Sequence, residues 1–337
     1  MQLVLKQTQS CFKISFKRFY QILDRELAAK RWQLTCGSVL MLSINKRDMP
    51  TEDRPTPDDI PPQKLDYPAS QRDMTPQPDS DLSNYSPANK LTGKVAFITG
   101  GDSGIGRAVA IAYAMEGAEV AILYHANETD AEDTKKMVKE IGNKDCLIIQ
   151  GDVRNYEDCE NAIKQVVDRF GKLNILVNNA AYQMTQKKFE DISLEQFRRT
   201  METNVFGYFY MVKAALPYLE EGDVIINTGS VVGKMGKAML VDYSTSKGAV
   251  HTFTKSLALN LGDRGIRVNS VVPGPVWTPN IPATMPVEKV DKYDTDGIIK
   301  RAAQPEELAP AYVFMASSDS SFVTGALYDV TGGQLSA

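Results

Sequence analysis

The feature that most constrains the fold of this chain is a cluster of glycines between two apolar stretches. Val95–Thr99 is a short run typical of a buried strand, and residues 105–115 are an apolar stretch that predicts a helix. Between them lies Gly100-Gly101-Asp102-Ser103-Gly104. Glycines in such a turn allow a tight bend, let the backbone approach a pyrophosphate and let the helix pack on the strand. The pattern predicts a dinucleotide-binding loop, although glycines here can also serve packing alone.

From residue 94 onward, short apolar strands alternate with longer helical stretches. The predicted strands are residues 95–99, 119–124, 146–150, 175–177, 224–227, 266–272 and 326–330. The predicted helices are residues 105–115, 128–141, 157–170, 193–219, 243–261 and 305–317. Strands that alternate with helices form a parallel sheet covered on both faces. We therefore expect an α/β fold over residues 91–337, a single-domain Rossmann-type doubly wound parallel sheet of about seven strands with helices on both faces.

Two stretches of unusual composition precede this body. Residues 1–48 carry nine basic and three acidic residues, and residues 49–90 hold nine of the 17 prolines. The basic bias suits a transit peptide but the acidic residues do not; the alternative is that translation begins at Met49. Residues 49–90 are expected to form an extended, surface-wrapped or disordered leader. Neither stretch has a motif with chemistry, so a chain that begins at Met49, or even near Ser86, is expected to fold and stay active.

Composition excludes several classes of protein. The longest apolar run, residues 108–115, is far shorter than the ~20 residues of a membrane-spanning helix. The net charge of −4 argues against nucleic acid as a partner, and the four cysteines show no CxxC spacing. With His125 and His251 as the chain's two histidines, a histidine-rich metal site or a Ser-His-Asp triad has little to work with. We expect a cytoplasmic protein that binds no metal, nucleic acid or membrane.

Short polar motifs follow the predicted strands. Asp152-Val153 follows the third strand, Asn178-Asn179-Ala180-Ala181 the fourth, Ser230 the fifth, and Pro273-Gly274-Pro275-Val276 with Thr278 the sixth. Tyr243 and Lys247 open the next helix, and their i, i+4 spacing places both side chains on one helix face. A Tyr-xxx-Lys pair alone is weak evidence, because chance predicts roughly one in a chain of this composition. The evidence is stronger here because the pair comes after the glycine loop and Ser230 in the sequence and opens the helix that follows the fifth strand.

Together these motifs resemble the short-chain dehydrogenase/reductase family, in its single-domain form, over residues 91–333. Residues 99–106 match the family's TGxxxGIG, and Asn204, Ser230, Tyr243 and Lys247 match its catalytic tetrad. One departure is Ala181, which stands where the family's NNAG motif has glycine. The proline-rich leader that runs into residues 88–94 is similar to a bacterial subgroup of largely uncharacterised, glucose-dehydrogenase-like oxidoreductases.

The resemblance implies an NAD(P)(H)-dependent oxidoreductase that interconverts an alcohol and a carbonyl. Tyr243 is then the general acid in reduction and the base in oxidation, and Ser230 hydrogen-bonds the substrate oxygen. Lys247 lowers the pKa of the phenol, ordinarily about 10, and holds the nicotinamide ribose. Asn204 anchors a water that feeds protons to Lys247. His251 is expected to be a packing or surface residue.

The residues implied for cofactor binding lie mostly in the loops that follow the strands. They are Gly100, Ser103, Gly104, Ile105, Gly106, Tyr124, His125, Asp152, Val153, Asn179, Ala180, Tyr243, Lys247, Pro273, Gly274, Val276 and Thr278. An NAD enzyme of this type places an acid about 20 residues beyond the glycines to bind the ribose hydroxyls. Residues 123–127 contain no carboxylate, so NADP is favoured over NAD, with use of both left open. Asn127 could receive the 2′-phosphate, or Glu128 could reach back to a ribose.

Other functions and the substrate stay open at this point. A catalytically silent dinucleotide-binding regulator is disfavoured by the intact tetrad, and a sugar-nucleotide epimerase by the absence of TGxxGxxG. The substrate pocket is expected to involve residues 181–184 and 231–235, together with residues 277–300, a proline-punctuated stretch typical of a lid. A small aldehyde, ketone, sugar or polyol would suit such a site. The resemblance implies a homotetramer, with residues 326–333 near the subunit interface.

Overall fold

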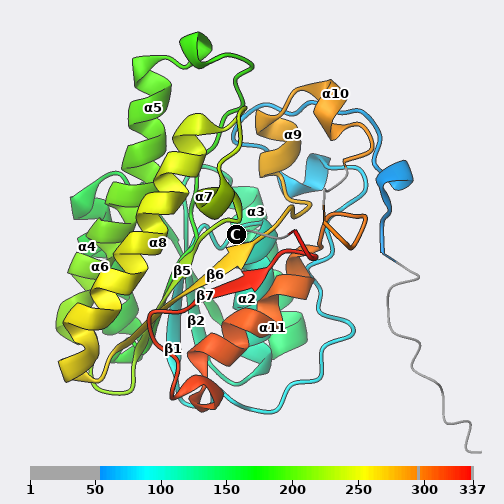
Figure 1. Cartoon of the computed structure of the whole chain (residues 1–337). Helices are drawn as coiled ribbons and strands as arrows, with labels where there is room; N and C mark the ends of the chain where they lie inside the picture. Colours follow the sequence, from blue (N-terminus) through cyan, green and yellow to red (C-terminus); the bar gives the residue numbers. More distant parts are fainter. Residues whose placement is uncertain (1–53, 294–296, 335–337) are drawn as a thin grey trace, which may run out of the picture. The chain divides into compact units, whose positions relative to one another are not determined.

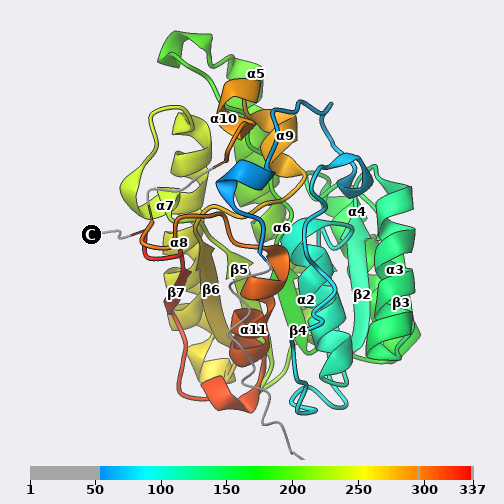
Figure 2. The ribbon, with the colours of Figure 1, turned by 90° about the vertical axis from the view of Figure 1, so that its right-hand side faces the viewer.

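Seven parallel strands form the centre of the computed structural model, which describes residues 54–293 and 297–334. The strands are β1 (Val95–Thr99), β2 (Glu119–Tyr124), β3 (Cys146–Gln150), β4 (Ile175–Asn178), β5 (Val224–Thr228), β6 (Arg267–Pro273) and β7 (Leu327–Val330). Their order is β3-β2-β1-β4-β5-β6-β7, and each of the six pairings is parallel. Figure 2 shows β7 and β3 at opposite edges of the sheet. The predicted doubly wound sheet is confirmed; the basic leader, residues 1–48, lies outside the described residues.

Two apolar clusters, one on each face, hold helices against the sheet. Along β1, Ala96 and Ile98 belong to the cluster with α2 (Gly104–Met115), α3 (Glu128–Gly142) and α11 (Pro305–Ala316). Val95 and Phe97 point into the cluster with α4 (Tyr156–Phe170), α6 (Gly207–Ala215) and α8 (Val241–Leu261). Figure 1 shows these two layers on either side of the sheet. Because both faces are covered, β1, β4 and β5 are buried at every position rather than at alternate ones.

The stretch predicted as one helix over residues 193–219 contains a wider turn. It consists of α5 (Leu194–Met201), the π-helical turn η4 (Glu202–Phe206), α6 and the short 3₁₀ turn η5 (Leu216–Tyr218). Ser193 caps α5 as predicted, since its Oγ accepts the N–H of Gln196 at 3.0 Å. A π turn adds one residue to a helical turn and is frequent at functional sites. Here it contains Asn204, one of the four tetrad positions.

The segment predicted as a lid contains two short helices, α9 (Asn280–Thr284) and α10 (Val287–Val290). A third short helix, α7 (Val232–Met235), follows β5. All three lie beyond the carboxyl ends of the strands (Figure 1). Within the described residues, no helix is long and apolar enough to cross a membrane.

Residues 54–90, called the N-terminal arm below, run in extended conformation with two single 3₁₀ turns, η1 (Pro57–Asp59) and η2 (Gln71–Asp73). Ile60 and Met74 of the arm are buried in a third apolar cluster with Trp277 and residues of α9 and α10. Closer to β1 in the sequence, the buried carboxylate of Glu116 accepts hydrogen bonds from the hydroxyl of Tyr85 and from the backbone N–H groups of Ala88 and Lys90. The arm is therefore packed against the body at both of its ends.

Candidate active site

A cavity of about 710 Å³ lies at the carboxyl ends of the strands. Its walls come from the glycine loop, from the segments that follow β2, β3, β4, β5 and β6, and from the lid. The strand order reverses between β1 and β4, and ligands of open α/β sheets bind at such a switch point. The volume lies within the range of ordinary cofactor and substrate pockets.

Two positions of the glycine loop require glycine, one because of space and one because of backbone conformation. A Cβ on Gly106 would lie 2.0 Å from the carbonyl oxygen of Gly100. The first turn of α2 can therefore lie this close to the loop only because residue 106 is glycine. Gly104 begins α2 with a φ of +52°, a left-handed conformation that glycine adopts without strain. These constraints place the N-terminal end of a 12-residue helix, with its positive dipole end, at the wall of the cavity.

The loop after β4 is tied to the end of β1. The Oγ1 of Thr99 accepts the N–H groups of Asn179 and Ala180, at 2.9 and 3.0 Å. The amide of Asn179 donates in turn to the carbonyl of Gly100, at 3.1 Å. The two loops that flank the switch point are therefore held as one unit, and both line the cavity.

Tyr243 and Lys247 project from α8 into the same cavity as Ser230, which follows β5. The Ser230 side chain lies close enough to the Tyr243 phenol to lower its pKa. The Nζ of Lys247 donates to the carbonyl of Thr228 at 2.7 Å and to the Tyr208 hydroxyl at 3.3 Å. It lies 5.6 Å from the centre of the Tyr243 ring.

Burial shifts the pKa values of both groups toward their neutral forms. It raises the pKa of the Tyr243 phenol to about 12, although the neighbouring Ser230 side chain acts in the opposite direction. Burial also lowers the pKa of the Lys247 ammonium to about 7. The resemblance implies that Lys247 lowers the pKa of Tyr243. In the structure burial sets the pKa of Tyr243 instead, because the phenol is withdrawn from water, and Lys247, whose own pKa is lowered by burial, contributes no shift.

Asn204 lies behind the cavity wall rather than in it. Its Oδ1 accepts the N–H of Tyr182 at 2.7 Å, and its Nδ2 donates to the carbonyl of Tyr182 at 2.8 Å and to Ser246 at 2.9 Å. The side chain thus joins the π turn, the loop after β4 and α8. These contacts position the backbone around Tyr182, a role that the tetrad resemblance did not imply.

The structure brings together nearly all residues singled out from the sequence. Those that line the cavity are Gly100, Ser103, Gly104, Ile105, Tyr124, His125, Asp152, Val153, Asn179, Ala180, Ser230, Tyr243, Lys247, Pro273, Gly274, Val276 and Thr278. Gly106 and Asn204 support this lining from behind. Of the predicted substrate-pocket segments, residues 181–184 contribute Ala181 and Gln183, and residues 231–235 contribute Val231 and Val232.

Sequence analysis missed several lining residues that carry no motif. Arg154 and Arg199 place positive charge at the cavity, and Tyr67, Pro68 and Ala69 come from the arm. Asn127, a candidate ligand for a 2′-phosphate, uses its amide to donate to the carbonyl of Ala69 at 2.8 Å. The arm offered only its proline content as a signal, and that composition predicts extended chain without saying where the chain lies.

Comparisons with known proteins agree with this geometry. Residues 100–334 match a family model described as enoyl-(acyl carrier protein) reductase. The chain is 50% identical over 282 residues to the uncharacterized oxidoreductase YhdF of Bacillus subtilis, a match that covers 84% of this chain and 97% of YhdF. It is 44% identical over 282 residues to the glucose and ribitol dehydrogenase of Daucus carota, covering 82% of this chain and 97% of that protein.

A solved structure of a short chain dehydrogenase has a similar fold. The crystal structure of a short chain dehydrogenase from Burkholderia cenocepacia J2315 in complex with NADP superposes with a TM-score of 0.68 and 32% sequence identity. The superposition covers 72% of this chain and 98% of that one.

Proposed function

Because this chain belongs to the short-chain dehydrogenase/reductase family, we propose that it interconverts an alcohol and a carbonyl with NAD(P)(H), using Tyr243 as general acid and base. The observation that carries the proposal is the placement of Ser230, Tyr243 and Lys247 in one cavity with the glycine loop. A bound nicotinamide dinucleotide would supply the hydride in reduction or accept it in oxidation. The residues that would hold it fit: a helix N-terminus with a glycine approach, and a cavity that continues from Tyr124 to Tyr243.

Ser230 and Tyr243 act on the substrate oxygen in this proposal. In reduction, the hydroxyls of Ser230 and Tyr243 both hydrogen-bond the carbonyl oxygen, and Tyr243 gives it a proton as negative charge develops. In oxidation, the phenolate of Tyr243 takes the hydroxyl proton of the alcohol. A phenol with its pKa raised to about 12 is protonated at neutral pH, so it is ready to act as the acid.

Lys247 supplies protons to Tyr243 in this proposal. Its pKa of about 7 lets the amine take up and release protons near neutral pH. Hydrogen bonds to Thr228 and Tyr208 fix Nζ beside the Tyr243 ring, and the same ammonium can hydrogen-bond a ribose. Asn204 is the fourth member of the proposed tetrad. Through its hydrogen bonds with Tyr182 and Ser246 it also holds α8 against the loop after β4.

NADP(H) is the favoured cofactor. No carboxylate occurs from Leu123 to Asn127, the end of β2 where an NAD enzyme of this type places one. Tyr124 and His125 line the cavity there. The Burkholderia relative is described in complex with NADP, which supports the same choice. The substrate class is a small aldehyde, ketone, sugar or polyol, and the Daucus relative named for glucose and ribitol supports the sugar and polyol members.

A homotetramer completes the proposal. Phe206 and Phe209, on η4 and α6, are about half exposed, and Tyr328 of β7 is also exposed. Exposed aromatic side chains of this kind are typical of subunit interfaces.

A carbonyl panel tests the function directly. The purified chain is incubated with NADPH or NADH and a set of aldehydes, ketones and sugars, and cofactor oxidation is followed by absorbance. We expect turnover with at least one carbonyl and its loss in Tyr243→Phe. Dinucleotide binding without turnover on any carbonyl, or any corresponding alcohol with the oxidised cofactors, would favour a catalytically silent relative instead.

A further inference from the structure

The N-terminal arm contacts the lid on one side of the cavity. The Nζ of Lys64 donates to the carbonyl of Ala283 at 2.8 Å, and the N–H of Leu65 donates to the carbonyl of Pro282 at 3.2 Å. Farther along, the indole N–H of Trp277 donates to the carbonyl of Pro76 at 2.9 Å. The arm is therefore anchored to the segment that borders the catalytic end of the cavity.

Between Leu65 and Pro76 the arm contacts the glycine loop on the other side of the cavity. The Oε1 of Gln71, which is buried, accepts the N–H of Gly104, the first residue of α2, at 2.8 Å. The carbonyl of Ala69 accepts the amide of Asn127, just beyond β2, at 2.8 Å. These contacts lie at the end of the cavity where the adenosine half of a dinucleotide would bind.

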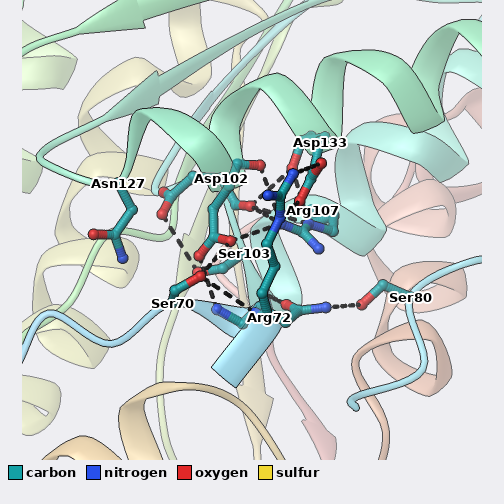
Figure 3. A network of polar contacts seen from close by, with 12 residues as sticks. Ser70, Arg72, Ser80, Asp102, Ser103, Arg107, Asn127 and Asp133 are labelled. Carbon is teal, nitrogen blue, oxygen red and sulfur yellow. Dashed lines mark hydrogen bonds and ion pairs between the residues drawn. The ribbon is translucent and has the colours of Figure 1, made fainter. Parts of the chain in front are cut away.

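A buried charge network makes this second anchor strong. The carboxylate of Asp130, fully buried on α3, accepts hydrogen bonds from the hydroxyl of Ser70 and from the N–H of Gln71, both at 2.8 Å. The Arg107 guanidinium lies 3.7 Å from the same carboxylate and donates to the carbonyl of Asp102 at 2.7 Å. Figure 3 shows Ser70 of the arm in this network with Asp102 and Arg107. A buried carboxylate without partners costs free energy of folding, and the arm supplies two of the partners of Asp130. Since Arg107 links Asp130 to the carbonyl of Asp102, the arm helps to hold the glycine loop.

Between the two anchors the arm itself forms part of the cavity wall. Tyr67, Pro68 and Ala69 line the cavity, and residues 65–71 can span roughly 20 Å when extended. The ring of Tyr67 meets that of Tyr182 edge to face at 5.2 Å. The guanidinium of Arg199 lies over both rings, 5.0 Å from Tyr67 and 4.4 Å from Tyr182. The wall segment is held by an aromatic and cationic stack as well as by its anchors.

We propose that the arm is the outer wall of the dinucleotide site, with Tyr67, Pro68 and Ala69 facing the bound cofactor and Gln71 positioning the glycine loop. The inference rests on the proposed function, because it needs a dinucleotide in this cavity. It follows that the arm contributes to cofactor affinity and slows cofactor release. It also follows that residues 54–85 are required for normal binding, which differs from the expectation for a chain beginning near Ser86.

The test measures binding rather than turnover. In the full chain, Kd for NADPH and NADH is measured by titration calorimetry, and the dissociation rate by stopped-flow displacement. Tyr67→Ala should raise Kd for the better cofactor about tenfold and speed its release, since it removes aromatic surface from the wall. Tyr67→Phe keeps the ring and should bind within about twofold of wild type. Lys90→Ala, an arm variant at an exposed ion pair with Asp319, is the matched control and should bind like wild type.

Gln71→Met tests the positioning role separately. It keeps the length of the side chain but removes the acceptor for the Gly104 N–H, so KM for the dinucleotide should rise while kcat stays within about twofold. A general loss of packing would lower kcat and the unfolding temperature as well. Equal KM values for Gln71→Met and wild type would remove Gln71 from the proposal.

Two outcomes separate the arm from the proposed function. A wild-type chain that binds neither dinucleotide refutes the function, whereas wild-type binding that Tyr67→Ala leaves unchanged refutes the outer wall alone. Should Tyr67→Ala fail to fold, trypsin cleavage after Lys64 and Arg72 in the wild-type chain decides. Saturating dinucleotide should slow this cleavage several-fold, and an unchanged rate would overturn the inference.

Discussion

The imidazole of His251 accepts a hydrogen bond from the backbone N–H of Ser230, with 3.3 Å between Nε2 and N. His251 lies one turn after Lys247 on α8 and beneath the loop that carries Ser230. A Cβ on Gly229 would approach Nε2 to 2.5 Å, so the loop rests directly on the ring. The sequence predicts a packing or surface residue, and in the structure His251 is a buried packing residue with a specific hydrogen-bond partner.

We predict that His251→Leu lowers kcat by about tenfold with little change in KM for the dinucleotide. The substitution leaves the buried N–H of Ser230 without its acceptor, a loss of roughly 1–3 kcal/mol that displaces the Ser230 hydroxyl. Steady-state kinetics with both substrates varied would measure the split. An unchanged kcat would mean that other contacts hold Ser230 in place.

Acid should destabilise the chain in part through His251. Burial lowers the pKa of His251 to about 4, below its ordinary 6.5, so the folded state keeps the ring neutral while the unfolded state binds a proton. The contribution to stability is therefore present above pH 6.5 and is lost as pH falls toward 4. Denaturant unfolding at several pH values should show a smaller acid loss in His251→Gln than in wild type. Parallel pH curves for the two proteins would contradict this assignment.

Tyr243→Phe should keep the fold and cofactor binding but lose at least about a hundredfold in turnover, the low end for general acid–base catalysis. The phenyl ring can fill the space of the phenol, and only the proton donor is removed. Calorimetric titration with the dinucleotide and single-turnover kinetics would separate binding from chemistry. Turnover like that of wild type would refute the mechanism.

Reduction and oxidation should respond differently to pH. Since the pKa of Tyr243 is raised to about 12, its acid form persists across the neutral range, whereas the phenolate needed for oxidation grows as pH increases. We expect kcat/KM for alcohol oxidation to rise steadily from pH 7 to pH 10, while that for carbonyl reduction does not rise. Profiles for both directions, recorded with one substrate pair, provide the measurement. A flat oxidation profile would show that another group sets the proton transfer.

Cofactor preference should respond to charge at the end of β2. Tyr124 ends that strand and lines the cavity, so Tyr124→Asp would place a carboxylate where it repels a 2′-phosphate. Wild type should use NADPH better than NADH by kcat/KM, and the variant should reverse the order. A tenfold preference of wild type for NAD, or NADP use untouched by the new carboxylate, would place the ribose site elsewhere.

Local sequence pattern predicted most of the sheet, whereas contacts between distant residues had to come from the structure. The strand at Val95–Thr99 and the cap at Ser193 depend on neighbouring residues, so periodicity and spacing were sufficient. The π turn at Asn204 changes the helix by one residue, too little to disturb an apolar period over 27 positions. The bond from Gly104 to Gln71 joins residues 33 apart in the chain, and no local pattern encodes it.

The candidate site shows the same division. Identity and spacing selected Tyr243, Lys247 and Ser230, because the chemistry restricts which residue types can serve. Spacing could not supply their protonation, since the pKa shifts of Tyr243 and Lys247 arise from burial by surrounding elements. Residue spacing can place an ammonium beside a phenol, but the free-energy cost of removing both from water depends on the elements that bury them.

The arm also has a consequence for the order in which the chain is made. Arg54 pairs with Glu306, 252 residues later, and Lys64 reaches the carbonyl of Ala283, 219 residues later. During synthesis the arm leaves the ribosome well before these partners exist, so its contacts with the lid and with α11 must form after most of the body has been translated. Until then Ile60 and Met74 lack the apolar cluster around Trp277 in which they are buried. The segment that emerges early is thus among the last to dock.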